Sequence, residues 1–441
     1  MKKHLLTLSS ILLAQFVANA QQVSYEEYDL DNGLHVILHQ DKTVPVVVTA
    51  VQYHVGAKDE NPKRTGFAHF FEHLLFEGTK NINRGDWFKI VATHGGNNNA
   101  YTTDDKTYYY EVFPSNNLQL GLWMESERML HPVINQIGVD TQNEVVKEEK
   151  RLRVDNQPYG NILAAVKQEM FKKHPYRWAT IGSMDHLDAA TLQEFQDFNK
   201  KFYVPNNAVL VVAGDFEINQ AKKWIQEYFS EIKKGEPVVR NTFIEEEITS
   251  QINATYQDPN IQLPMVVEAY RTPSMKTRDA RVLDIISSYL SGGKSSVLYK
   301  KLVDKDKTAL EVGAIALNQE DYGMYIIYGI PFNGKTSQEV VQEIDVEIAK
   351  LQNELISEKD FKKLQNIFEN RYVSANDDIE GVADNLATYY ALYGDITLIN
   401  KEIEIYRSIT REEIRDIAKK YLKTNQRIIL DYIPATDKAQ K

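Results

Sequence analysis

The chain has 441 residues, which is more than a single hydrophobic core usually supports, so two domains are expected. Its net charge of −11, without a long run of Lys and Arg, argues against nucleic acid as a partner. Because the chain has no cysteine, disulfides, thiol catalysis and thiolate metal ligands are excluded.

The N-terminus has the pattern of a secretory signal peptide, predicted to span residues 1–20. Residues 2–3 are both lysine, residues 5–17 are mainly apolar, and Ala18-Asn19-Ala20 supplies the small-x-small cleavage pattern. The apolar run is too short to span a membrane stably, and no other segment reaches about 20 apolar residues. We therefore expect an exported protein, periplasmic or secreted, without a membrane anchor. A buried N-terminal helix is the alternative.

The next part of the chain alternates between strand and helix patterns. Apolar, β-branched runs and 3.6-residue periodicity predict the elements of a first α+β domain over residues 21–235. Strands are expected near 25–31, 34–39, 46–54, 97–103, 107–113 and 208–214, and covering helices near 66–76, 116–130, 140–154, 160–172 and 190–203.

The same unit occurs a second time near the C-terminus. Residues 191–213 and 410–430 share Thr, Asp and Lys-Lys at one offset, and each reads as a capped helix, a polar turn and an apolar strand. Hairpin patterns at 99–114 and 314–331 recur at a similar offset. We therefore predict a linker at 236–255 and a homologous second α+β domain over 256–441. Chance similarity between the two units is the alternative.

The helix expected at 66–76 carries the sequence His69-Phe-Phe-Glu72-His73. Residues four apart lie on one face of a helix, so His69 and His73 can present both imidazoles to one metal ion. Glu72 lies on the same side and can take a proton from an activated water without being a ligand. The order is the inverse of the commoner His-Glu-x-x-His helix. Two unrelated histidines beside a solvated Glu, or a structural zinc, are the alternatives.

A third protein ligand is needed for such a site. No histidine follows His186, so the second domain cannot supply an imidazole. The acidic helix at 143–153 offers Glu144, Glu148 and Glu149, and its spacing alone does not choose among them.

Several segments together resemble the pitrilysin/insulysin family of metallopeptidases. They are residues 66–79, 98–102 and 156–160, Glu149, and the stretch 290–299 in the second domain. The chain is most similar to the short-chain branch that includes the mitochondrial processing peptidase and its bacterial relatives. The likeness covers nearly the whole mature chain.

The resemblance implies how the metal is held. It identifies Glu149 as the third ligand, so that His69, His73 and Glu149 hold one Zn²⁺ per chain with Glu72 as the general base. Family members often have a further glutamate that supports the site seven residues before this ligand; this chain has Gln142 there. Because Gln can still donate or accept a hydrogen bond, we expect the properties of the metal site to be altered rather than the site to be lost.

The resemblance also implies where the substrate peptide lies. The segment around 98–102 would be an edge strand to which the peptide adds as a further strand through backbone hydrogen bonds. An ordinary strand with a polar start is the alternative. The residues expected to bind substrate are Asn98, Asn99, Ala100 and Tyr101.

The fold implied by the family is α+β, with two homologous domains that form half of a clamshell. Each domain is expected to have a mostly antiparallel sheet with helices on one face. Family members close two such domain pairs around a chamber, and this chain supplies only one pair. A second chain should therefore complete the enclosure.

One departure from the family bears on that second chain. Active members carry an Arg and a Tyr seven residues apart that hold and polarise the substrate, but the matching positions here are Val303 and Leu310. Neither side chain can donate a hydrogen bond to an oxyanion. We therefore expect a heterodimer in which a homologous partner supplies the Arg/Tyr pair. A self-sufficient homodimer is the alternative architecture.

The sequence thus predicts a zinc endopeptidase that hydrolyses oligopeptides or unfolded proteins. A non-catalytic, substrate-holding or interaction subunit is the main alternative, although its usual mark is an eroded zinc motif, and the motif here is intact. A zinc-carrying exported protein without peptidase activity is a third hypothesis.

Overall fold

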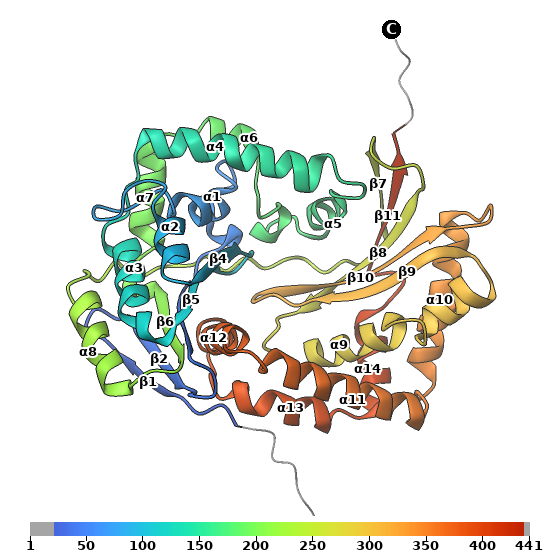
Figure 1. Cartoon of the computed structure of the whole chain (residues 1–441). Helices are drawn as coiled ribbons and strands as arrows, with labels where there is room; N and C mark the ends of the chain where they lie inside the picture. The colour runs from blue at the N-terminus through green and yellow to red at the C-terminus, as the bar shows by residue number, and fades with distance from the viewer. Residues whose placement is uncertain (1–21, 436–441) are drawn as a thin grey trace, which may run out of the picture.

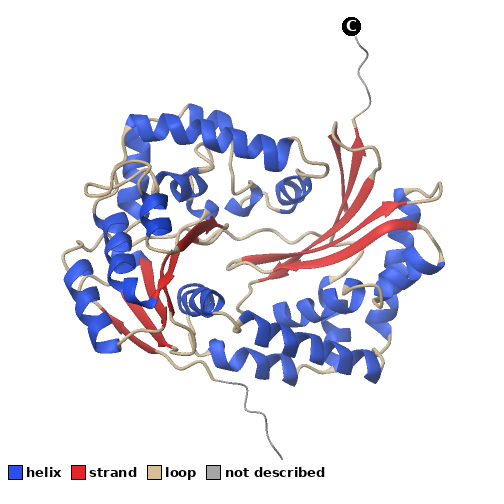
Figure 2. Ribbon diagram, in the orientation of Figure 1, coloured by secondary structure: helices blue, strands red, loops and turns tan. Residues whose placement is uncertain are grey.

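The computed structural model describes residues 22–435, so the predicted signal peptide at 1–20 lies outside the described residues. Two sheets with helices packed around them make up this part of the chain, and they lie side by side (Figures 1 and 2). Over the described range, no helix is long and apolar enough to cross a membrane.

The first sheet contains all six strands that the sequence predicts for the first domain. Its order is β1-β2-β6-β3-β5-β4, and only the β2–β6 pair is parallel. The strand β4 therefore lies at one edge of the sheet. The strands are β1 (Glu26–Asp29), β2 (His35–Gln40), β3 (Val46–Tyr53), β4 (Asn97–Thr102), β5 (Thr107–Pro114) and β6 (Ala208–Gly214).

The helices of the first half include all five that the sequence predicts, together with the unpredicted α2, α6 and α8. The helix predicted at 140–154 is formed by α4 and by a π-helix over Arg151–Asp155 that follows it directly. The helices are α1 (Phe67–Leu74), α2 (Trp87–Thr93), α3 (Leu118–Leu130), α4 (Gln136–Lys150), α5 (Ile162–Met170), α6 (Met184–Asp188), α7 (Leu192–Phe202) and α8 (Ile218–Phe229).

The second sheet repeats the topology of the first without an equivalent of β1. Its order is β7-β11-β8-β10-β9, and its parallel pair, β7–β11, takes the place of β2–β6. The first strand begins at Ile252, inside the stretch predicted as linker. The strands are β7 (Ile252–Asp258), β8 (Met265–Pro273), β9 (Ala309–Leu317), β10 (Tyr322–Pro331) and β11 (Ile428–Pro434).

In the described part of the chain, five helices lie between β10 and β11, as they do between β5 and β6, whereas α9 alone lies between β8 and β9, where the first half has α1 and α2. The predicted repeat units form α7–β6 and α14–β11, and both helices begin with a capping box, Thr191 with Glu194 and Thr410 with Glu413. The helices are α9 (Arg278–Ser291), α10 (Ser337–Asn353), α11 (Glu358–Ala375), α12 (Ile379–Thr388), α13 (Leu398–Ser408) and α14 (Arg411–Tyr421).

Each half lends one helix to the sheet of the other half. The helix α12 packs on β3 and β6 of the first sheet, and α5 packs on β8 and β11 of the second (Figure 1). The predicted arrangement, with helices on one face of each sheet, therefore describes only the helices that belong to the same half. Because the central strands are buried on both faces, they read as nearly continuous apolar runs, as at 209–213 in β6.

The tips of the two predicted hairpins meet between the halves. The Glu320 N–H donates to Asp105 Oδ2 at 3.0 Å, and Lys58 Nζ lies 2.6 Å from Glu320 Oε2 and 2.9 Å from Asp105 Oδ1. Lys167 Nζ lies 2.6 Å from Asp104 Oδ2. These charges are largely removed from water and are paired with one another, as burial requires, and the Lys58–Glu320 pair crosses the junction.

Candidate metal centre

The start of α1 is fixed by a buried carboxylate and a glycine. Gly66 has φ +98°, and a Cβ there would lie 2.8 Å from the carbonyl oxygen of Ile181. The Glu60 carboxylate accepts the backbone N–H groups of Gly66 and Ala68, both at 2.9 Å, which satisfies donors at the helix N-terminus. The helix that carries both histidines is thus anchored at its first turn.

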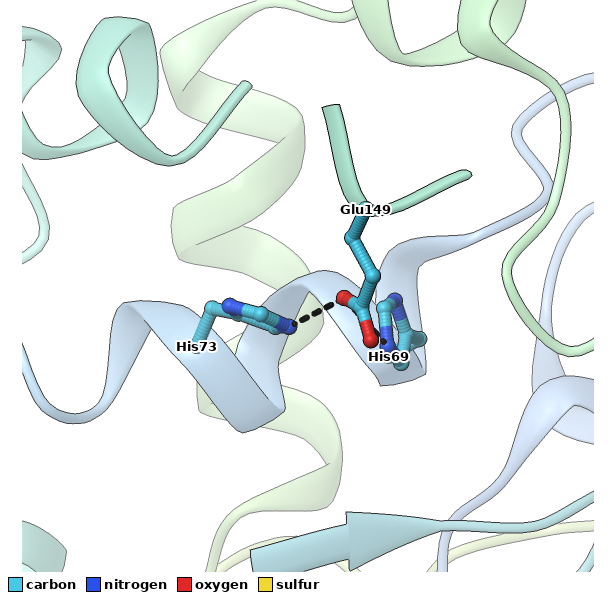
Figure 3. A group of neighbouring side chains, drawn as sticks. All are labelled: His69, His73 and Glu149. Atoms are coloured by element: carbon cyan, nitrogen blue, oxygen red, sulfur yellow. Dashed lines mark ion pairs between the residues drawn. The ribbon is translucent and has the colours of Figure 1, made fainter. Parts of the chain in front are cut away.

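The apolar residues of α1 fix its rotation. Phe67 and Phe70 are buried and pack against Phe195 of α7, with ring centroids 4.5 and 4.7 Å apart. This contact leaves the face with His69 and His73 turned towards α4 (Figure 3).

His69, His73 and Glu149 converge on one point, the first two from α1 and the third from the last turn of α4 (Figure 3). Glu149 Oε2 lies 3.1 Å from His73 Nε2 and 3.4 Å from His69 Nε2. The ligand atoms of all three lie within 4.8 Å of one another. Of the three acidic residues that the sequence left open, only Glu149 reaches the histidines within the described residues.

The donor set and its spacing fit Zn²⁺. Two nitrogens or oxygens about 2.1 Å from a tetrahedral zinc lie about 3.4 Å apart, close to the distances observed here. Glu149 Oε1 accepts a hydrogen bond from Arg153 Nη1 at 2.7 Å, whereas the buried Oε2 makes no well-directed hydrogen bond to any described residue. Oε2 is therefore left for a metal.

The protonation states also suit a metal ligand set. Burial, reinforced by the neighbouring His73, lowers the pKa of His69 to about 4, so its imidazole is neutral at pH 7. Contact with His73 holds the pKa of the Glu149 carboxyl below its ordinary value. A neutral imidazole and an ionised carboxylate are the forms that bind metal.

Glu72 lies beside the cluster, next to the edge strand. Burial raises the pKa of its carboxyl above the ordinary value, although the neighbouring Thr102 hydroxyl of β4 opposes this shift. A raised pKa brings a carboxylate closer to the range in which it exchanges protons at neutral pH. The role of Thr102 as a neighbour of Glu72 was not inferred from the sequence, although alternation along β4 places its side chain on the α1 side.

Gln142 does not contact the three converging side chains through a hydrogen bond. Its Nε2 donates to Glu77 Oε1 at 2.5 Å, and its Oε1 is buried without a hydrogen-bond partner in the described part of the chain. Glu77 follows α1 by three residues and also pairs with Arg84. Gln142 therefore connects α4 to the segment after α1.

The four residues expected to bind substrate lie on β4 with alternating orientation. Ala100 packs towards the first core, whereas the Tyr101 hydroxyl donates to Asp384 of α12 at 2.7 Å on the opposite face. Asn99 is exposed, and its Oδ1 accepts the N–H of Ala100 at 2.9 Å. The Asn98 side chain is partly buried, and its Nδ2 has no partner among residues 22–435.

The two positions at which the resemblance expects an Arg/Tyr pair lie on, and directly before, the edge strand of the second sheet. Val303 lies in a π-helix at Tyr299–Lys305 and packs against the second core. Leu310, on the edge strand β9, is 48% exposed.

Sequence reasoning gave no role to Arg153, although its spacing of four residues from Glu149 is the signal of a helical pair.

Comparison with known proteins identifies the family that this chain resembles. Residues 35–183 match the family described as "Insulinase (Peptidase family M16)", and residues 189–368 match "Peptidase M16 inactive domain". The chain is 28% identical to "Zinc protease PqqE" of Helicobacter pylori, over 96% of this chain and 97% of that protein.

Solved structures show the same fold. The crystal structure of a protease from Helicobacter pylori has a TM-score of 0.88 and 26% identity, covering 93% of this chain and all of that one. The periplasmic protease PqqL from Escherichia coli has a TM-score of 0.76 and 18% identity, and the match covers 94% of this chain but 48% of that chain. This chain therefore belongs to the pitrilysin/insulysin family, peptidase family M16.

Proposed function

We propose that this chain is a zinc-dependent endopeptidase in which His69, His73 and Glu149 bind the metal and Glu72 is the general base. The observation that carries the proposal is the convergence of His69, His73 and Glu149. The carboxylate of Glu72 lies beside them, on the same helix as the two histidines. The relatives named zinc proteases support it.

The residues of the chain divide the chemistry between them. When bound, zinc would supply Lewis-acid chemistry, lowering the pKa of water and polarising the peptide carbonyl. Glu72 removes a proton from the attacking water and returns it to the leaving amine. Arg153 holds Glu149 Oε1 and so leaves a single oxygen of that carboxylate for the metal.

The substrate would lie along the free edge of β4. An extended peptide that adds to this edge satisfies the unpaired backbone groups of the strand and passes next to α1. Because backbone hydrogen bonds do not depend on side chains, this mode accepts varied sequences, which suits unfolded proteins and oligopeptides as substrates.

A second chain would complete the site. The second half has Val303, in a π-helix, and Leu310, on β9, where the resemblance places the hydrogen-bond donors of active relatives, so this chain would lack that part of the usual active site. The match covers only 48% of the PqqL chain, so that protein has room for a second unit of this size. We propose a heterodimer with a homologous partner, and a homodimer remains the second candidate.

The proposed location is outside the cytoplasm, periplasmic or secreted. The predicted signal peptide at 1–20 supports export, and PqqL is itself described as periplasmic.

Glu72→Gln tests the proposed chemistry. The substitution keeps size and hydrogen bonding but removes the base, so kcat/KM for a quenched peptide should fall about 10²- to 10⁴-fold while bound zinc is unchanged. Equal activity of this variant would refute the role of Glu72.

Reconstitution separates the proposal from the non-catalytic alternative, which the apolar side chains at Val303 and Leu310 favour. The mature chain should cleave peptides slowly alone and much faster with a homologous chain that carries the Arg/Tyr pair. If the assembly is equally active when this chain carries Glu72→Gln, the chain is an interaction subunit.

A further inference from the structure

The segment that follows Glu149 is held in an uncommon backbone conformation. The helix α4 passes into the π-helix at 151–155, an irregularity that is frequent at functional sites, and then into a turn at 156–160. Tyr159 in this turn has φ +61°, a left-handed conformation that bulky side chains rarely adopt. Such a conformation persists where neighbouring structure enforces it.

The neighbouring structure is the end of β7, in the other half of the chain. Asp258, the last residue of β7, is 1% exposed and is surrounded by hydrogen-bond donors. Its Oδ2 accepts the backbone N–H of Tyr159 at 3.2 Å and the Tyr432 hydroxyl at 2.7 Å, and its Oδ1 accepts the N–H of Asn260 at 2.7 Å. Asp258 thus joins the turn to two strands of the second sheet.

Two further contacts fasten the same segment. The Asn260 side chain donates to the carbonyl oxygen of Asp155 at 2.6 Å, and the Tyr159 hydroxyl donates to the carbonyl oxygen of Leu263 at 2.9 Å. Figure 1 shows the end of α4 reaching the β7 side of the second sheet. The π-helix and the turn are therefore both anchored to the second half.

The turn transmits its position to the π-helix because the two are in tight contact. A Cβ on Gly160 would lie 2.2 Å from the carbonyl oxygen of Val154, so only glycine allows this approach. Gln157 donates its backbone N–H to Val154 at 3.2 Å and its side-chain amide to the carbonyl oxygen of Leu152 at 2.8 Å. The π-helix in turn continues the helix that carries Glu149.

We propose that Asp258 is a positioning residue for Glu149, so that the second sheet, which offers no ligand, sets the affinity of the metal centre. The inference rests on the proposed function, since it concerns the same site. Groups that hydrogen-bond directly to metal ligands typically change metal affinity about 10- to 100-fold when removed, and Asp258, which acts through the turn, should give an effect at the lower end. The motif at 156–160 then serves as the link between Asp258 and the ligand-bearing helix.

The experiment compares Zn²⁺ affinity, measured by chelator competition, in the mature wild type and Asp258→Ala. The expected result is an affinity about 10-fold weaker. Hydrogen exchange of the metal-free chain supplies a readout that does not need zinc: amides at 149–157 should exchange faster in Asp258→Ala. A wild type that binds no zinc would refute the proposed function, while the exchange result would still decide the inference.

Glu245→Ala is the matched control. Glu245 is also a buried carboxylate, and it accepts the backbone N–H groups of Lys172, Lys173 and His174 at the other end of α5. The Glu245→Ala substitution should lower thermal stability while leaving zinc affinity and hydrogen exchange at 149–157 unchanged. Unchanged affinity in Asp258→Ala, or an equal loss in Glu245→Ala, would overturn the proposal.

Asn260→Ala covers the case in which Asp258→Ala does not fold. Asn260 is exposed, so its removal leaves the core intact while freeing the carbonyl oxygen of Asp155. Zinc affinity should fall several-fold at an unchanged melting temperature. An unchanged affinity in this variant would count against the proposal.

Discussion

Replacing Arg128 by Met should unfold the first half far more readily, because Arg128 is the cation that pairs with two buried carboxyl groups. Its side chain and those of Glu111 and Glu125 are all 0% exposed. The guanidinium lies 2.8 Å from Glu111 Oε1 and 3.1 Å from Glu125 Oε1, and it donates to the carbonyl oxygen of Leu75 just after α1.

The size of the effect follows from what is left behind. Met fills much of the space between the rings of Trp87 and Tyr109, 4.1 and 4.4 Å from the guanidinium, so the loss is mainly electrostatic. Breaking a buried pair in this way costs about 3–5 kcal/mol of unfolding free energy. The triple variant with Glu111→Gln and Glu125→Gln removes the uncompensated charges and should recover most of that loss.

The pH dependence of the unfolding free energy lost in Arg128→Met is a second test of this explanation. Burial already raises the pKa of Glu111 well above its ordinary value, and removing Arg128 takes away the larger of the two contacts that oppose that shift, leaving only the Trp87 side chain. When a carboxyl group stays protonated in the folded protein but ionises in the unfolded chain, the unfolding free energy of the protein falls as pH rises above about 4.5. Urea denaturation should therefore show a larger deficit at pH 8 than at pH 5. A deficit below about 1 kcal/mol, or one independent of pH, would refute this reasoning.

Three further predictions concern the junction and the repeat. His54 and Lys58 hold the pKa of Glu320 below its ordinary value of 4.5. In urea titrations, Glu320→Gln should therefore lower the unfolding free energy at pH 7, and this loss should shrink as pH falls below 4.5. Leu386→Ala should cost about 2–5 kcal/mol in the same assay, because this α12 side chain is fully buried on the first sheet; a cost near zero would mean that α12 is not docked in solution. Thr410→Ala should cost about 1 kcal/mol by loss of the α14 cap, whereas Thr410→Ser should not.

The parts of the fold that depend on local sequence were predictable. All six strands of the first sheet and its five main helices lie where periodicity and capping residues indicate, since these signals act within a few residues. The repeat of helix, turn and strand likewise predicted the matched sheets. The short α2 was not predicted because its seven residues give too little periodicity.

The exchange of α5 and α12 between the halves could not be read from the sequence. Both helices are amphipathic, and amphipathicity shows that a face is buried without showing against which sheet. The same limit applies to Asp258, since nothing near it in sequence indicates a contact with Tyr159 across 99 positions.

The candidate site was predictable in part. Helical spacing brought His69, Glu72 and His73 together, but spacing left three glutamates open for the third ligand, and the resemblance chose Glu149. The structure brings Glu149 to both imidazoles. It gives Gln142 a contact with Glu77 instead, which depends on the path of the chain after α1.

Bound zinc per chain, in the mature wild type and in Glu149→Gln, tests the central claim most directly. The wild type should retain close to one zinc per chain after gel filtration, and the variant, whose neutral amide is a poor ligand, much less at an unchanged fold. Little zinc in folded wild type, or equal zinc in both proteins, would contradict the proposed metal centre.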